Sequence, residues 1–138
     1  MIEFKVYGAP GPQGSKRHVG KGVMVESSKK VAPWREAVKW AVIPTGLKAT
    51  PGLPLSLEVT FTLAKPQSAP RNRRTWPMRK PDLDKLIRST MDALTESGVW
   101  EDDARVILIT AAKCFPGEGY QSLSAPGAWI KIQEINPQ

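Results

Sequence analysis

Alternation of apolar and polar residues marks the strands of this chain. Residues 2–8 and 55–63 place an apolar side chain at every second position, which is typical of a strand with one buried face. The apolar segments 105–114 and 128–135 predict two further strands. Residues 9–22, which include Lys16, Arg17 and His18, predict a loop rich in Gly and Pro, and segment 23–27 predicts a short strand that closes a hairpin after it.

A repeat of three to four residues predicts two helices. The first begins near Pro33, which suits the first turn of a helix, and has ended by Gly46. The second covers 84–97, and Gly98 suits its C-terminal end. The apolar stripes consist of Trp34, Ala37, Val38 and Ala41 in the first helix and of Leu83, Leu86, Ile87, Met91 and Leu94 in the second.

The order of these elements predicts an α+β fold, in which a small mixed β-sheet carries two helices packed on one face. At 138 residues without an internal repeat, the chain is expected to form a single domain over 1–138. Segment 64–81 interrupts the pattern because it has no periodicity and is rich in Pro and Arg. A long irregular segment inside a compact domain is usually functional or mobile.

Basic residues outnumber acidic ones, with 20 Lys and Arg against 13 Asp and Glu, and the formal net charge is +7. This charge favours a polyanionic partner, most commonly nucleic acid, although a protein can also be basic without such a partner. Cys114 is the only cysteine and His18 the only histidine, which excludes an internal disulfide and argues against a Cys/His zinc site. No apolar run approaches the roughly 20 residues that span a bilayer, so we expect a soluble protein without membrane contact.

Basic side chains and one aromatic residue form the candidate DNA-binding surface. In the basic loop 64–81, Arg and Lys suit phosphate contacts, and Trp76 suits stacking on an unpaired base. The alternative is a disordered, solvated loop. The candidate DNA-binding residues are Lys16, Arg17, Lys29, Lys30, Arg71, Arg73, Arg74, Trp76, Arg79 and Lys80.

Two pairs of acidic residues contrast with the basic character of the chain. Asp82 and Asp84 flank Leu83 at the entrance of the second helix, so that both carboxylates lie on its polar side. Asp102 and Asp103 follow one short turn after the same helix. A helix of this length spans about 21 Å. The two pairs therefore meet only if the sheet register or a partner subunit brings them together.

Three or four converging carboxylates would need a positive counter-charge. A site made of oxygen ligands selects a hard cation such as Mg²⁺ or Mn²⁺, and such cations activate water and phosphate groups in nucleases. The pattern leaves open a simpler interpretation, in which the first pair caps the helix and the second decorates a solvated turn.

Three charged residues at intervals of four form a polar stripe on the second helix. For Asp84, Arg88 and Asp92 we favour a ladder of ion pairs. Arg88 lies only one turn inside the acidic end of the helix, from where it could instead reach a scissile phosphate. Lys85, in the first turn, is a second candidate for that role, and its alternative is a solvated surface lysine.

The stretch 82–106, "DLDKLIRSTMDALTESGVWEDDARV", resembles the core motif of the RusA family of Holliday junction resolvases, found in bacteria and their phages. The family pattern is D-x-D-N-L-x-K, then D-A-L within a helix, then G-x-W/F-x-D-D. The resemblance covers about 25 contiguous residues with the same internal spacing. The matching positions are Asp82, Asp84, Leu86, Asp92, Ala93, Leu94, Gly98, Trp100, Asp102 and Asp103.

The resemblance implies a homodimeric, Mg²⁺-dependent crossover junction endodeoxyribonuclease that resolves four-way DNA junctions by paired symmetric nicks. It assigns catalysis and metal binding to Asp82, Asp84 and Asp103, with Asp102 as a supporting acid. It also implies that the dimer, and not one chain alone, completes the acidic cluster. The implied location is the cytoplasm of a bacterium or of a phage-infected host.

Two positions depart from the family pattern. Lys85 stands where the family has Asn, and Arg88 stands where it has Lys. Arginine keeps its proton at ordinary pH, so Arg88 replaces the family lysine only if the role is electrostatic, which we favour. If a proton must move, Lys85 would have to serve. Two other functions therefore stay open: a non-catalytic nucleic-acid-binding dimer, and a metal-dependent nuclease for flaps or other branched DNA.

Overall fold

The structure is a computed structural model that describes residues 2–14, 16–18, 24–26 and 29–136, with the backbone alone for 16–18 and 24–26. Its elements, in chain order, are β1 (Ile2–Tyr7), β2 (Lys16–His18), β3 (Met24–Glu26), α1 (Val31–Val42), η1 (Ile43–Thr45), β4 (Leu55–Thr62), α2 (Leu83–Glu96), η2 (Asp103–Arg105), β5 (Val106–Cys114) and β6 (Gly127–Glu134).

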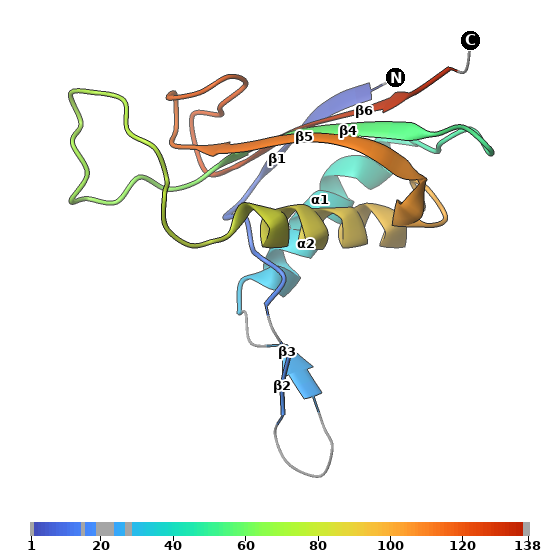
Figure 1. The fold of residues 1–138 in the computed structure, drawn as a ribbon, viewed down its shortest axis with the longest axis horizontal. Coiled ribbons are helices and arrows are strands. Elements are labelled where there is room, and N and C mark those ends of the chain that lie inside the picture. Colours follow the sequence, from blue (N-terminus) through green and yellow to red (C-terminus); the bar gives the residue numbers. More distant parts are fainter. Residues whose placement is uncertain (1, 15, 19–23, 27–28, 137–138) are drawn as a thin grey trace.

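Four strands form the main sheet, in the order β1-β6-β4-β5. The sheet is mixed, because β4 pairs parallel with β5 and antiparallel with β6, while β1 pairs antiparallel with β6. Both helices lie on one face of this sheet (Figure 1). The predicted α+β fold is therefore confirmed. The four strands of the main sheet, α2 and the start of α1 lie within about two residues of their predicted positions.

The core lies between the sheet and the helices. Side chains of β4 that face the helices, such as Phe61, are fully buried, as the alternation in the sequence predicts. Trp34 of α1 lies at the centre, with its ring 6.3 Å from that of Phe61. Its indole Nε1 donates a hydrogen bond of 3.0 Å to Thr90 Oγ1 of α2. This bond links the two helices and satisfies a buried polar group.

A short ribbon of β2 and β3 stands apart from the main sheet, on the side of the helices (Figure 1). The predicted strand at 23–27 is confirmed in part, since β3 covers Met24–Glu26 and closes a hairpin with β2. The sequence pattern assigned Lys16–His18 to a loop, and that assignment is wrong because these residues form β2. The side chains of Lys16 and Arg17 lie outside the described part of the chain.

The connection from β4 to β5 determines where the acidic residues lie. The chain leaves β4 at one end of the sheet, passes through the basic loop 64–81 and enters α2, and β5 then runs back along the helix (Figure 1). Parallel neighbours require such a crossover. The D-x-D pair thus stands at the loop end of α2, and the D-D pair at the opposite end. Neither of the described helices is long and apolar enough to cross a membrane.

Candidate functional site

The first acidic pair stands at the entrance of α2 with both carboxylates exposed to solvent. Asp82 occupies the N-cap position, with φ −70° and ψ 137°, yet its side chain makes no capping hydrogen bond. Asp84 lies in the first turn. Asp82 thus stands at the N-cap, as the alternative capping interpretation requires, but its side chain does not cap the helix. The Asp82 carboxylate is left available for another partner.

The second acidic pair belongs to η2. Asp102 Oδ1 accepts a hydrogen bond of 2.8 Å from the backbone N–H of Ala104 and so caps this short helix. Arg105 holds the turn in place: it donates to the Glu101 carboxylate and to the carbonyl oxygens of Thr50 and Leu53. Asp102 therefore has a structural role as a cap, while Asp103 follows it in the first turn.

Asp103 lies in an acidic environment. The pKa of its carboxyl group is raised, first by partial desolvation and then by the hydrogen bond and the charge of Asp102 and by the charge of Asp92. The ion-pair ladder predicted for Asp84, Arg88 and Asp92 is wrong, because these three side chains form no ion pair in the described structure. The charge of Asp92 acts on Asp103 instead.

Asp82 and Asp103 do not meet within one chain. They lie at opposite ends of α2, which has 14 residues, and are therefore about 21 Å apart along the helix axis. Within the described residues, no group of three Asp, Glu, His or Cys side chains is arranged to hold a metal ion. Asp82 and Asp84 offer carboxylate oxygens, which are the ligands that a hard cation prefers. Two carboxylates are too few to hold such a cation by themselves. A single chain does not complete the expected site.

The two candidate cations of α2 lie beside the first acidic pair. Lys85 follows Asp84 directly and is half-buried, and Arg88 is exposed one turn further along. The carbonyl oxygen of Lys85 accepts a hydrogen bond of 3.0 Å from the backbone N–H of Gln13. This bond ties the N-terminal segment to the start of α2. Neither cationic head forms a salt bridge within the described structure, so both are free to meet an anion.

The basic loop 64–81 is held in place by residues of the opposite loop and of β5. Glu118 accepts hydrogen bonds of 2.8 Å from Lys65 Nζ and from the backbone N–H of Thr75. The bond from Lys65 is the main reason why the pKa of Glu118 is lowered. Lys113 Nζ donates to the carbonyl oxygens of Arg79, at 2.9 Å, and of Pro81, at 3.0 Å. These contacts argue against the interpretation of this segment as a disordered loop, although most of its charged side chains are solvated.

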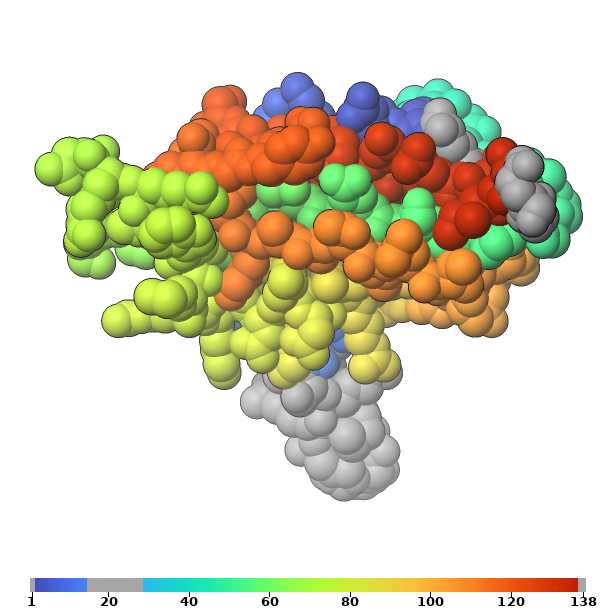
Figure 2. Space-filling view, turned by 45° about the horizontal axis from the view of Figure 1, so that its top comes forward, coloured from blue at the N-terminus to red at the C-terminus, as the bar shows by residue number. Residues whose placement is uncertain are grey.

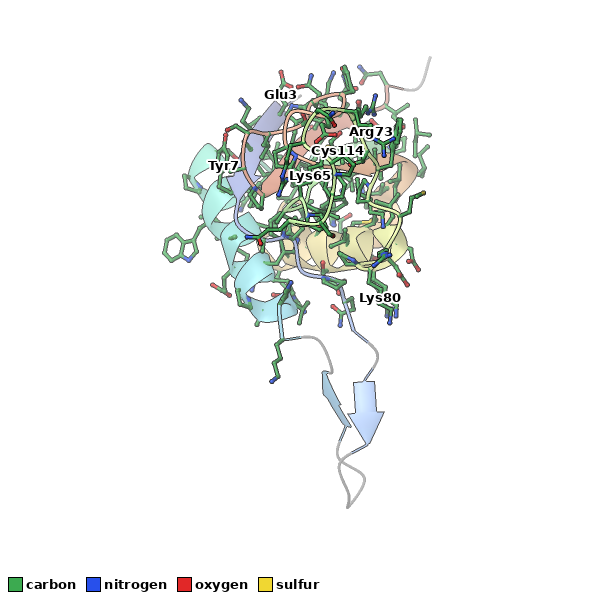
Figure 3. The ribbon with its side chains drawn as sticks, turned by 90° about the vertical axis from the view of Figure 1, so that its left-hand side faces the viewer. Glu3, Tyr7, Lys65, Arg73, Lys80 and Cys114 are labelled. Atoms are coloured by element: carbon green, nitrogen blue, oxygen red, sulfur yellow. The ribbon has the colours of Figure 1, made fainter. Side chains whose placement is uncertain are left out.

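A cavity of about 920 Å³ opens between this loop and the N-terminal segment. Asp82 and Lys85 lie in its wall, together with Trp76 of the loop. The Arg74 guanidinium carbon lies 4.9 Å from the centre of the Trp76 ring, a cation–π contact that orients an exposed indole. Figure 3 shows Lys65 and Cys114 in the interior of this end, with Arg73 and Lys80 toward its outside.

Every candidate DNA-binding residue whose side chain the structure describes is exposed. The exposed candidates are Lys29, Lys30, Arg71, Arg73, Arg74, Trp76, Arg79 and Lys80. Four of them, Lys30, Trp76, Arg79 and Lys80, line the same cavity as Asp82. Basic residues of the loop, Trp76 and the D-x-D pair thus share one end of the molecule.

The sequence of this chain matches one family of known proteins. The family model described as Endodeoxyribonuclease RusA matches residues 8–132, which is most of the chain. No curated protein sequence matches the chain closely. The match includes the D-x-D pair, α2, the D-D pair, β5 and most of β6. The chain therefore belongs to the RusA family of endodeoxyribonucleases, which are DNA-binding nucleases of the Holliday junction resolvase type.

Proposed function

We propose that this protein is a Mg²⁺-dependent crossover junction endodeoxyribonuclease that resolves four-way DNA junctions by paired symmetric nicks. The observation that carries the proposal is the position of Asp82 at the entrance of α2, exposed, without a capping bond and beside a basic loop. A carboxylate at an N-cap normally gives its oxygen to the helix. Here it is left free at the surface that suits a phosphate backbone.

The metal ligands in this proposal are Asp82, Asp84 and Asp103. Mg²⁺, with Mn²⁺ as a substitute, would neutralise charge on a phosphate and lower the pKa of a bound water. Asp102 supports Asp103 by fixing η2. Because one chain keeps Asp103 far from Asp82, the proposal requires a homodimer in which each site takes Asp103 from the other chain.

The cations of α2 act on the phosphate in this proposal. Arg88 provides a fixed positive charge, since a guanidinium does not release its proton. Lys85, half-buried in the cavity wall beside Asp82, can move a proton as well as stabilise charge. The free heads of both side chains support this role.

The exposed basic residues bind the backbone of branched DNA, and Trp76 stacks on a base that is unpaired at the junction. The same role is proposed for Lys16 and Arg17 of β2. We also propose that the protein works in the cytoplasm of a bacterium or of a phage-infected host, as its family resemblance implies.

The proposal is tested by incubating the protein with a synthetic four-way junction and with a linear duplex of the same sequence. In Mg²⁺ the junction is expected to receive symmetric nicks in two opposing strands while the duplex stays intact, and EDTA stops the reaction. The variant Asp82→Asn should be slower by at least about 100-fold, because even indirect supports of a metal ligand are worth up to that factor.

Two outcomes would replace the proposal. Junction binding that weakens with salt, with no cutting at any metal concentration, would identify a non-catalytic DNA-binding dimer. This alternative has one observation in its favour, namely that the described residues of a single chain hold no cluster of three ligands. Equal cutting of flaps and junctions would identify a metal-dependent nuclease for branched DNA in general.

A further inference from the structure

The basic loop 64–81 begins with a cation that is largely shielded from solvent. Lys65 Nζ donates a hydrogen bond of 2.8 Å to Glu118 Oε2, and the two side chains are 8% and 18% exposed. The same ammonium group donates to the carbonyl oxygen of Arg73, at 3.3 Å, and lies 5.9 Å from the centre of the Phe115 ring. This is the most enclosed ion pair among the described residues. Enclosed charges are costly unless their hydrogen bonds are made, so Lys65 and Glu118 hold each other in place.

The second oxygen of the Glu118 carboxylate holds the middle of the loop. Glu118 Oε1 accepts a hydrogen bond of 2.8 Å from the backbone N–H of Thr75. One carboxylate thus binds the loop at two separate points, Lys65 and Thr75. Hydrogen bonds to a charged group are stronger than those between neutral groups. Because both oxygens are used, a side chain with one acceptor oxygen, or with a shorter reach, cannot make the two bonds together.

Glu118 itself stands on a turn that is fixed to the main sheet. This turn, residues 115–123, follows β5, and Figure 2 shows loop 64–81, in yellow-green, beside the orange atoms of this part of the chain. The backbone N–H of Glu118 donates to the carbonyl oxygen of Phe115, and that of Leu123 donates to Thr62 Oγ1 of β4. Phe115, Leu123 and Thr62 are buried. The Glu118 carboxylate therefore connects the loop to the core.

The backbone that Glu118 holds lies between the two members of the cation–π contact. Arg74 and Trp76 flank Thr75, so the position of the Thr75 backbone determines where their side chains begin. The indole of Trp76 is 58% exposed, and the Arg74 guanidinium lies over one face of the ring, which leaves the other for a base. A side chain that is already oriented loses less conformational entropy when it binds.

We propose that Glu118 is a positioning residue for junction binding and that it orients Arg74 and Trp76 through the backbone of Thr75. The inference rests on the proposed function, because it takes Trp76 as the residue that stacks on an unpaired base. Glu118 is largely enclosed and acts through its neighbours instead of touching the DNA. On charge alone, an acid beside a DNA-binding surface weakens binding because it repels phosphates. A positioning role predicts the opposite, namely weaker binding when this acid is removed.

These opposite expectations are tested with Glu118→Gln, and Glu36→Gln is the control that removes the same charge. Glu36 is exposed on α1. Binding to a synthetic four-way junction is measured in EDTA by fluorescence anisotropy. The dissociation constant should rise by about fivefold or more in Glu118→Gln, the lower end of the value of one stacked base, and should not rise in Glu36→Gln. An unchanged or tighter binding by Glu118→Gln, or an equal rise in both variants, would overturn the proposal.

The proposal also requires that Glu118 act through Trp76. Because Trp76→Ala removes the indole, adding Glu118→Gln to it should change the dissociation constant by less than about twofold, the usual scatter of a double-mutant cycle. Effects that multiply in the double variant would show that Glu118 supports the loop without positioning the indole. Wild-type binding by Trp76→Ala would reject the proposal as well.

If Glu118→Gln fails to fold, Glu118→Asp decides. Aspartate keeps the charge but is shorter by one methylene group, so its carboxylate cannot reach Lys65 and Thr75 together. The dissociation constant should therefore rise without any change in net charge, and the rise should disappear when Trp76 is replaced by Ala. A folded Glu118→Asp that binds the junction like the wild type would reject the positioning role.

Measuring binding in EDTA separates this inference from the proposed function. A chain that binds junctions through Glu118 and Trp76 but cuts none in Mg²⁺ keeps the positioning role and rejects the function. A chain that cuts junctions, but whose binding is unchanged in Glu118→Gln, keeps the function and rejects the positioning role.

Discussion

At the scale of single residues, the two N-caps show why the role of an aspartate cannot be inferred from its position in the sequence. Asp82 and Asp102 each precede a helix, but only Asp102 gives its carboxylate to the backbone. The pattern D-x-D predicted a candidate pair, and the structure leaves the Asp82 carboxylate of that pair without a capping bond. The pattern could not distinguish capping from chemistry, because both begin with an acid at a helix entrance. Asp92 was assigned wrongly, since its environment depends on the path of the chain after α2.

The raised pKa of Asp103 leads to a prediction about stability. Replacing Asp103 by Asn removes a carboxylate whose charged form is disfavoured by desolvation and by neighbouring acids. We expect Asp103→Asn to lose cleavage but to melt no lower than the wild type at neutral pH, which thermal denaturation measures.

The sign of this effect determines its pH dependence. An acid with a raised pKa in the folded state costs stability when ionised, and the cost disappears as pH falls through that pKa. The difference between the melting temperatures of Asp103→Asn and the wild type should therefore shrink on acidification. A variant that melts clearly below the wild type at neutral pH would show that Asp103 is a structural residue.

At the scale of elements, β1 and α2 followed the sequence pattern closely, because each has one face that is more buried than the other. The basic loop 64–81 did not, because its structure depends on contacts distant in sequence, from Glu118 and Lys113. Such contacts leave no local periodicity. The ribbon strand β2 was missed for a related reason, since three residues are too few to show alternation.

The anchored loop predicts a specific role for its tryptophan. Replacing Trp76 by Ala should weaken binding to a four-way junction by about 1–3 kcal/mol, the usual value of one stacked base. Met78→Ala is the matched control, since Met78 is an exposed apolar residue of the same loop. Binding is measured by fluorescence anisotropy in EDTA, with a linear duplex as a second ligand. Equal losses in both variants, or an equal loss on the duplex, would argue against stacking at the junction.

At the scale of the whole molecule, the two acidic pairs lie apart, and only the D-x-D pair shares its end with the basic loop. The exposed cations of loop 64–81 lie at the entrance of α2 with the D-x-D pair, and the D-D pair follows the far end of this helix. The length of the predicted helix already indicated that the two acidic pairs lie far apart within one chain. The sequence could not show which edge of the sheet is open. That information comes from the strand order and from the exposed centre of β5.

The claim that each site takes residues from two chains is tested most directly with a mixed dimer. One chain carries Asp82→Asn and the other Asp103→Asn, and two affinity tags isolate the dimer that contains both. If Asp82 works with the partner's Asp103, both changes fall in one site and the other site is intact. The mixed dimer should then nick one strand of a four-way junction in Mg²⁺, although neither variant cuts alone. A mixed dimer that assembles and binds the junction but makes no nick would contradict the account.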